Sequence, residues 1–521
     1  NRSYSLFQIC NTSLTNLHLE GQKNTVMNYK TLFEKTPPTR LFFKAAIPGA
    51  VGMLASALYQ LADGIFVGQI LGDTAFAALN LAMPLVIINF SLADLIGVGS
   101  AVPISIRLGE KNEKEANNIF SCACLLILAT AVVLGAALFA AAPALIRMMG
   151  ADDTLLEPAV QYLRVYALCS PLTTVVFAVD NYLRICGKIR GSMLLNIFMS
   201  VFSAALEFVF LFVFRWGIWG AALATCTGML VCTLLAFYPF VRGKMQLRFC
   251  RPRFSASMIR KIIACGSPSF LSNIAGRLTS ILMNIILLQL GGAAAVSVYG
   301  ILMYADGFVQ PLLYGMCDSL QPAVGYNWGA RRYDRVWAIE RRCFTVSGLL
   351  SAAAAVVLLA FPNQVIALFM NHADTALLQM AVPALQLFSL TYLTRWFSFA
   401  SQSFLSAIGK PVSASVISLS ITLVFPLLLI AALWPAGLTG LWLNLPVTSA
   451  LAAVLSAVLL VRFNRRRLSD TIPGSAQAAA RGQIAGESHS AQAEQMRQPA
   501  DTPDPAQADG DQADHTDLTD V

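Results

Sequence analysis

Charged residues are scarce in this sequence, and that scarcity narrows the class of protein it encodes. Only 12% of its 521 residues are charged and 56% are hydrophobic, whereas an ordinary globular protein carries about 25% charged residues. So few charges cannot cover the surface of a soluble protein of this length. The apolar stretches are long and continuous, unlike the alternating segments of about ten residues that build transmembrane β-barrels. The composition therefore predicts an all-α polytopic membrane protein.

Motifs for nucleotide, acyl-transfer or metal chemistry are also missing. The sequence contains no P-loop, no Gly-x-Ser-x-Gly motif and no histidine-rich metal motif. Its 11 cysteines are an odd number scattered mostly through apolar runs, so neither a disulfide framework nor a metal site follows. No soluble basic domain gathers the positive charge, which disfavours nucleic-acid binding. We expect no enzyme and no cofactor, with energy supplied by an ion gradient.

Twelve apolar runs are long enough to cross a bilayer, whose hydrocarbon core of about 30 Å requires about 20 residues of helix. We expect them to form two six-helix lobes over 41–241 and 259–461, joined by a basic cytoplasmic linker, 242–258. The runs lie near 41–70, 74–105, 118–142, 157–183, 190–213, 217–241, 259–289, 295–322, 341–361, 378–407, 412–433 and 437–461.

The distribution of Lys and Arg predicts the orientation of these spans. When the loops are numbered alternately from the inside, the outside set holds only Arg147 and Arg215. This positive-inside bias predicts an even number of spans with both termini in the cytoplasm. We expect 1–40 to be a cytoplasmic segment, with 1–26 a candidate extraneous extension. The polar composition of 462–521 predicts a disordered acidic cytoplasmic tail.

An internal repeat relates the two sets of six spans. Several Pro and Gly residues recur at a shift of 220 residues, in matching places of the hydropathy order. Because six is even, both halves have the same orientation, as in transporters that bind cargo between two parallel repeats. The recurring pairs are Pro48 and Pro268, Gly72 and Gly292, Gly109 and Gly329, Gly217 and Gly437, and Gly220 and Gly440.

Carboxylates inside the predicted spans are functional candidates, because an ionisable side chain is costly there. At a rise of about 1.5 Å per residue, Asp63, Glu207 and Thr225 reach the outer part of the first lobe. Tyr59 shares a helix face with Asp63, and a polar stripe of Asn196, Ser200 and Ser203 leads to Glu207. This group could bind a proton or Na⁺; interhelical hydrogen bonding is the alternative. The predicted coupling residues are Tyr59, Asp63, Asn196, Ser203, Glu207 and Thr225.

Two further acids, Asp94 and Asp180, fall near the cytoplasmic ends of the second and fourth spans. There they could pair with Arg107 or Arg184, or reach the interface. They are also candidates for residues of the substrate cavity or of its gate.

In the second lobe, Arg277 and Arg395 need counter-charges, and Asp306 and Asp318 are the only candidates in its spans. Two interpretations stay open for these four residues. They form a structural charge network, or they line the cargo path or a gate.

Several stretches of the sequence resemble the multidrug and toxic compound extrusion (MATE) transporters of the multidrug/oligosaccharidyl-lipid/polysaccharide flippase superfamily. The resemblance covers roughly 40–461, and its order and spacing together are specific. The stretches are Ile47 to Gly49, Tyr59 to Gly68, Leu183 to Gly187, Gly217 to Thr225, Ile408 to Pro411 and Gly437 to Trp442.

The resemblance implies two lobes in a V shape around a central cavity. It implies export of drugs or toxic organic cations, across a bacterial-type inner (plasma) membrane, by a monomer that exchanges them for H⁺ or Na⁺. In members similar to this chain, the first lobe binds the ion through Asp on helix 1, Asn and Asp on helix 5 and Thr on helix 6. The matching positions are Asp63, Ser203, Glu207 and Thr225. Ser203 stands where those members have Asn and keeps a side-chain oxygen, and Glu207 stands where they have Asp and keeps the negative charge. Another subgroup's second-lobe carboxylate site is absent here.

Three other functions compete with drug export. A lipid-linked glycan flippase of the same superfamily would favour a more cationic cavity, and Arg277 with Arg395 keeps that possibility open. A membrane glycosyl or acyl transferase would need a large catalytic loop, and the internal loops are short. A major-facilitator transporter would also give twelve spans, but the stretch Arg107-Leu108-Gly109-Glu110-Lys111 fits its loop motif poorly.

Overall fold

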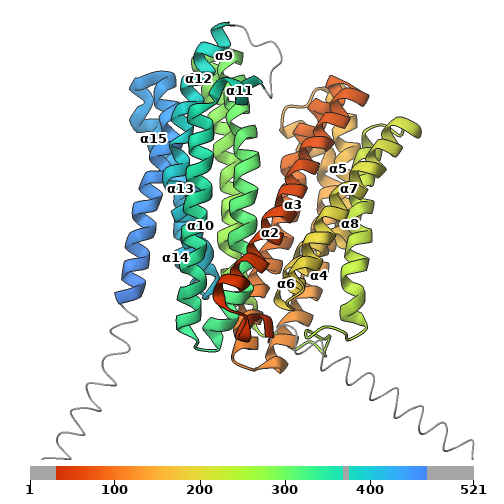
Figure 1. Cartoon of the computed structure of the whole chain (residues 1–521). Helices are drawn as coiled ribbons and strands as arrows, with labels where there is room; N and C mark the ends of the chain where they lie inside the picture. The colour runs from red at the N-terminus through yellow and green to blue at the C-terminus, as the bar shows by residue number, and fades with distance from the viewer. Residues whose placement is uncertain (1–30, 368–374, 466–521) are drawn as a thin grey trace, which may run out of the picture. The chain divides into compact units, whose positions relative to one another are not determined.

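The computed structural model describes residues 31–367 and 375–465, and every element in these ranges is helical (Figure 1). The chain divides into two units, Asn1–Leu459 and Leu460–Val521; the first unit holds all the features discussed below. The predictions for 1–26 and for the acidic tail beyond 465 lie outside the described residues.

The first lobe begins with a short π-helical turn, η1 (Thr31–Lys35), and continues through six spans. Side-chain caps start two of these helices: Asn112 accepts a bond from the Glu115 amide at 3.2 Å, and Asp152 accepts one from the Leu155 amide at 3.0 Å. A hydrogen bond from the Thr154 hydroxyl at 2.8 Å, together with the one from the Leu155 amide, holds the pKa of the Asp152 carboxyl below its usual value. The spans are α2 (Pro38–Phe66) with η2 (Val67–Leu71), α3 (Asp73–Gly109), α4 (Glu113–Met148), α5 (Asp153–Thr173) with α6 (Val175–Ile185), α7 (Ile189–Phe208) with η3 (Val209–Val213), and α8 (Ile218–Val241).

The second lobe repeats this plan with more breaks. The helix 437–465 ends the described chain. The other elements of the second lobe are α9 (Ala256–Gly329), α10 (Tyr333–Ala360), α11 (Pro362–Ala367), α12 (Thr375–Ser389), α13 (Thr391–Ala407), α14 (Pro411–Leu419), η4 (Ser420–Val424), α15 (Phe425–Leu433) and η5 (Trp434–Ala436).

The twelve predicted spans are confirmed. In the described ranges, 9 helices are long and apolar enough to cross a membrane, and α12 with α13 adds a span bent by 41°. Two of the 9 contain 74 and 55 residues, which is about 110 and 80 Å of helix, far more than one bilayer. Each is broken in the middle, at Gly292 (φ 64°) and at Gly437 (φ 59°). Each therefore counts as two spans.

The residues that mark the repeat adopt the same backbone conformation in both lobes. A positive φ is unusual for a residue other than glycine, yet Lys111 has one, and so does Arg331, 220 residues later. This agreement gives the sequence repeat a structural basis. The matched pairs are Gly72 (86°) and Gly292 (64°), Gly217 (73°) and Gly437 (59°), and Lys111 (61°) and Arg331 (57°).

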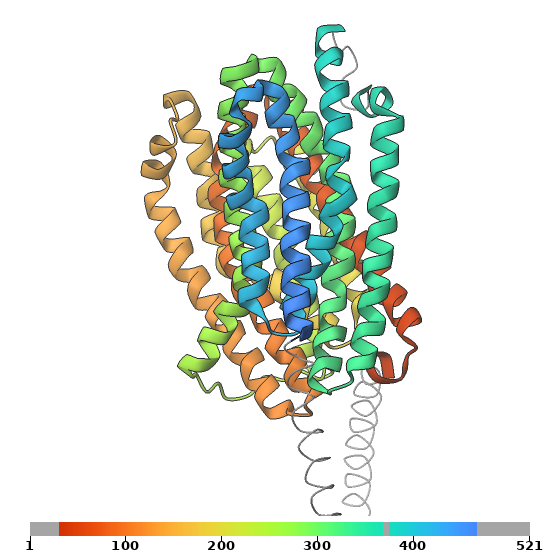
Figure 2. The same cartoon turned by 90° about the vertical axis from the view of Figure 1, so that its left-hand side faces the viewer.

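Each lobe has its own apolar core. Val67, Tyr162 and Ile218 belong to a buried cluster of the first lobe, and Leu287 and Phe388 to one of the second. In Figure 1, α3–α8 gather on the right and α10 and α12–α15 on the left. Figure 2 faces the second lobe and shows α14 and α15 (blue) in front of α9 (green).

The lobes touch where glycines remove side chains from the interface. A Cβ on Gly99 would lie 2.1 Å from the Ile262 carbonyl oxygen, and one on Gly109 would lie 2.0 Å from that of Tyr326. Both distances are shorter than any real contact, so a side chain at either position would push α3 away from α9. These contacts lie toward the end of the molecule that carries the basic loops.

Candidate functional site

A cavity of about 1210 Å³ lies between the two lobes and is lined by residues of both. It extends from Asp94 and Asp318, near the glycine contacts, to Gln69 and Phe76, beside the Gly72 turn. Aromatic and methionine side chains alternate with amide and hydroxyl groups along its walls. Adaptable apolar walls with a few polar groups are typical of sites for small organic molecules.

Four charged side chains line this cavity among the described residues: Asp63, Asp94, Arg277 and Asp318. All four were predicted as coupling or cavity residues. Three are acidic and one is basic, so the cavity favours a cation over an anion of the same size.

The first lobe brings Tyr59, Asp63, Glu207 and Thr225 together beside the cavity, which Asp63 lines, and Ser203 lies one turn before Glu207 on α7. The Tyr59 hydroxyl hydrogen-bonds Thr225 Oγ1 at 2.6 Å and donates to Glu207 Oε2 at 3.4 Å. The carboxyl groups of Asp63 and Glu207 lie close enough to interact directly with each other. Asp63 is 4% exposed and Glu207 0%. Helices α2, α7 and α8 therefore supply one compact group of oxygen atoms.

Three oxygen atoms of this group lack a hydrogen-bond partner among the described residues: Asp63 Oδ1, Glu207 Oε1 and Ser203 Oγ. Buried polar atoms are nearly always satisfied, and unpaired buried carboxylates are especially costly. An all-oxygen set of this kind suits a proton or a hard cation such as Na⁺. Gly228 allows α8 to approach this closely, because a Cβ there would lie 1.9 Å from Ser203 Oγ.

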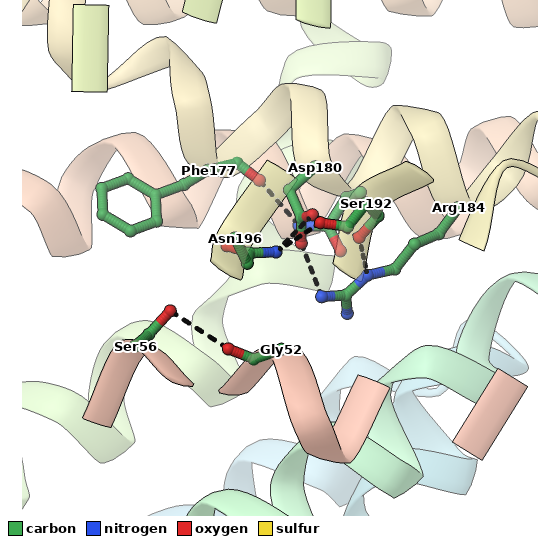
Figure 3. Close-up of polar contacts among 8 residues, drawn as sticks. Gly52, Ser56, Phe177, Asp180, Arg184, Ser192 and Asn196 are labelled. Atoms are coloured by element: carbon green, nitrogen blue, oxygen red, sulfur yellow. Dashed lines mark hydrogen bonds and ion pairs between the residues drawn. The ribbon is translucent and has the colours of Figure 1, made fainter. Parts of the chain in front are cut away.

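Asn196, which we predicted as a coupling residue, does not lie in this group. Its Nδ2 atom donates to Asp180 Oδ1 at 2.9 Å, and Ser192 donates to the same oxygen. Arg184 closes the network through an ion pair with Asp180 at 2.6 Å (Figure 3). Asn196 lies about three helical turns from Glu207, so one polar stripe on α7 serves two separate sites.

The Asp180 network is a satisfied charge cluster outside the cavity lining. Asp180 therefore pairs with Arg184, one of the two partners predicted for it, and does not line the cavity as a substrate residue. Figure 3 shows Gly52 and Ser56 of α2 next to the network. A Cβ on Gly52 would meet Asn196 Cβ at 3.6 Å, so α2 packs directly against it.

Asp94 and Asp318 lie at the floor of the cavity and interact electrostatically across the two lobes. Asp318 accepts hydrogen bonds from Gln321 at 2.8 Å and from Ser403 at 3.3 Å. Arg107 is not the partner of Asp94, because it pairs with Glu110 at 2.6 Å and with Glu115 at 3.0 Å. Asp94 lines the cavity, and Arg184, its other predicted partner, lies near enough to attract it electrostatically.

In the second lobe, Arg395 and Asp306 form an ion pair at 3.0 Å. The Tyr392 hydroxyl donates to the same carboxylate at 2.7 Å, and Gln310 can bridge both partners with its amide turned over. Two of the four residues, Asp306 and Arg395, thus pair as the interpretation of a charge network predicted, and Asp318 lines the cavity. Arg277 is not part of the charge network and lines the cavity instead.

One family profile, described as MatE, matches residues 48–209 and again 268–430. The two matches begin 220 residues apart, so the same profile recognises each lobe. The chain belongs to the MatE family. Membership confirms the resemblance seen in the sequence, and it makes the chain a membrane transporter.

Relatives and solved structures agree with this assignment. The MatE chain is 25% identical over 443 residues to the multidrug export protein MepA of Staphylococcus aureus (strain N315), covering 84% of this chain and 96% of the relative. It is 27% identical over 444 residues to MepA of Staphylococcus saprophyticus, with the same coverage.

The fold of the MatE chain matches solved MATE transporters. A crystal structure of MATE in complex with MaL6 has a TM-score of 0.79 at 23% identity, and covers 84% of this chain and 98% of that one. An outward-facing multidrug resistance MATE family transporter gives the same values. The two-lobed, twelve-helix V-shaped fold predicted from the sequence is therefore confirmed.

Sequence reasoning missed a tyrosine pair that borders the carboxylate group of this MatE protein. The Tyr162 hydroxyl is buried without a hydrogen-bond partner among the described residues and interacts electrostatically with Asp63. Its ring centroid lies 5.1 Å from that of Tyr166, one turn further along α5. The only signal was two tyrosines at a spacing of four within an apolar span.

Proposed function

We propose that this MatE chain is a secondary active multidrug exporter that exchanges cationic or amphipathic compounds for H⁺ or Na⁺. The observation that carries the proposal is the buried Asp63–Glu207 pair with unsatisfied oxygens at the wall of the cavity. The names of the MepA relatives support the choice of cargo.

The coupling follows from competition for one group of carboxylates. A proton or Na⁺ on the pair neutralises it and removes the attraction for a cationic cargo. Release of the ion restores the charge and favours cargo binding. One charge crossing a membrane potential of 100 mV supplies about 2.3 kcal/mol, which is enough to change a cargo's affinity by more than tenfold.

The arrangement of contacts supports an alternating-access cycle. The lobes are closed by the Gly99 and Gly109 contacts toward the basic loops, and the cavity lies beyond them. If the basic loops are cytoplasmic, as the positive-inside rule requires, this conformation faces outward. Both termini are then cytoplasmic in a multi-pass protein of a bacterial plasma membrane. We propose that it acts as a monomer, because one chain supplies both lobes of the cavity.

The cavity charges favour drug export over lipid-linked glycan flipping. A pyrophosphate-linked cargo would meet three carboxylates and one arginine in the lining. Arg395, which kept the flippase possibility open, is neutralised by Asp306.

Transport into inverted membrane vesicles under an imposed pH or Na⁺ gradient tests the proposal. We expect gradient-driven dye uptake by the wild type and its loss in Asp63→Asn and Glu207→Gln. Glu157→Gln removes an exposed carboxylate of α5 and is the matched control. If both site variants kept gradient-driven uptake, coupling would not reside at this pair.

A further inference from the structure

Arg277 of α9 is a cation without a counter-charge in the cavity wall. It lines the cavity, and no acid of the described residues pairs with it. The other intramembrane arginine of this lobe, Arg395, has its charge balanced by Asp306 and a tyrosine hydroxyl. An arginine within a membrane span is costly unless it pairs or faces water. Arg277 meets this condition by facing the cavity, so its donors are available to a bound molecule, whereas Arg395 is bonded to Asp306.

The surroundings of Arg277 form a polar stripe on one face of α9. Asn273, Ser280 and Asn284 lie one or two turns away, and all line the same cavity. Across the cavity, the lining acids Asp63 and Asp94 belong to the first lobe. Two of the three lining acids thus belong to the first-lobe wall, and the second-lobe wall carries Arg277 with amides, hydroxyls and one acid, Asp318, at the floor.

We propose that Arg277 binds an anionic substituent of the cargo, so that the exported compounds include zwitterionic amphiphiles carrying a carboxylate. The inference rests on the proposed export function and specifies its substrate class. A guanidinium presents a planar fork of donors that matches a carboxylate with two parallel hydrogen bonds. The carboxylate lies against Arg277, the cationic group faces the acids of the first lobe, and the apolar body spans the methionine and aromatic walls between them.

A zwitterion fits these charges better than a lipid pyrophosphate. A pyrophosphate carries at least two negative charges, and Arg277 offers one positive charge in a lining with three acids. A single carboxylate on a cationic scaffold satisfies Arg277 and leaves the acids with a partner. The same cavity also holds purely cationic cargo, which makes no use of Arg277.

Two dyes that share one scaffold separate the contribution of the cargo's carboxylate from that of its cationic group. Rhodamine 110 carries a free carboxylate on a cationic fluorophore, and rhodamine 123 is its methyl ester. Binding of each dye to the purified full-length protein is measured by fluorescence polarisation. The variants are Arg277→Gln, Arg277→Lys, and the control Arg147→Gln, which removes an exposed charge outside the cavity.

We expect Arg277→Gln to weaken rhodamine 110 binding by about tenfold or more, the effect of losing charge-assisted hydrogen bonds. Rhodamine 123 binding should change by less than about twofold. Arg277→Lys, which keeps the charge but loses the fork, should fall between the wild type and Arg277→Gln for rhodamine 110. Arg147→Gln should leave both dyes unchanged.

Equal losses for both dyes in Arg277→Gln, or no loss for either, would overturn the anion subsite while leaving drug export intact. A wild-type protein that binds neither dye and exports neither from proteoliposomes would count against the proposed export function, and the subsite would fall with it. A pyrophosphate-bearing lipid that displaces both dyes better than a carboxylate competitor would also overturn the assignment.

Discussion

Asp63 of α2 and Glu207 of α7 meet inside the first lobe, and each keeps one carboxylate oxygen without a hydrogen-bond partner among the described residues. Tyr59 joins the pair to Thr225 through its hydroxyl group. Because Asp63 also lines the cavity, we propose that an ion on the pair and a cation in the cavity compete for the same charge.

The Asp306–Arg395 pair stabilises the second lobe. Arg395→Gln would leave Asp306 buried without its counter-charge, and we expect a loss of about 3 kcal/mol. This is the lower end of the range for a broken buried pair, since the Arg395 side chain is 23% exposed. The drop is measured as the melting temperature of the detergent-solubilised protein. Asp306→Asn combined with Arg395→Gln should recover most of it; a double variant no more stable than Arg395→Gln alone would rule out the pair as the cause.

The Gly99 contact holds the lobes together at the end with the basic loops. We expect Gly99→Ala to separate the lobes there, because its methyl group would lie 2.1 Å from the Ile262 carbonyl oxygen. Overpacking of about 1–3 kcal/mol should raise the population open at this end by about tenfold. Spin labels on Lys114 and Arg341 report the separation by double electron–electron resonance. Gly276→Ala is the control, since nothing lies within 4 Å of its added methyl. Identical distance distributions in both variants would contradict the prediction.

The segment before α2, residues 33–36, forms hydrogen bonds that connect the first lobe to the second. Arg335 donates to the carbonyl oxygens of Phe33 at 2.9 Å and Thr36 at 2.7 Å, and the Tyr326 hydroxyl donates to Glu34 at 2.6 Å. These contacts reach α9 and α10 from a segment that leads directly into α2 of the first lobe.

Arg335→Ala removes two of these bonds and should favour opening at the same end, by about tenfold for bonds to a charged group. The Lys114–Arg341 label distances again report it, with exposed Arg260→Ala as the control. A distribution in Arg335→Ala that matches the control would show that the segment does not restrain the lobes.

Much of the fold could be predicted from the sequence, because each span is a local property of the chain. Apolar runs set the twelve helices, and Gly292 and Gly437 recur at the shift where the structure breaks two long helices. The contacts of Phe33 and Glu34 with the second lobe could not be predicted. They depend on carbonyl groups meeting a distant arginine, and no local pattern records such a meeting.

The cluster around Asp63 and Glu207 was predictable only in part, because helix position is a local property but contacts between helices are not. Depth along each helix placed Asp63, Glu207 and Thr225 at one level, and the structure brings them together. Asn196 was assigned to them because it shares a face with Glu207, but a helix face extends over many turns and can contact different neighbours at each. The Asp180–Arg184 pair, on another helix, decides where Asn196 bonds.

The central claim is that cargo and ion exchange at the Asp63–Glu207 pair, and ion release on cargo binding tests it most directly. Tetraphenylphosphonium, a simple organic cation, is added to purified protein in a weakly buffered solution, while a pH dye and a Na⁺ electrode record released ions. Because coupling between two ligands is reciprocal, we predict that the wild type releases about one H⁺ or Na⁺ for each cation bound. Asp63→Asn and Glu207→Gln should release none, and Glu157→Gln should behave as the wild type. Binding without release in the wild type, or unchanged release in both site variants, would contradict the account.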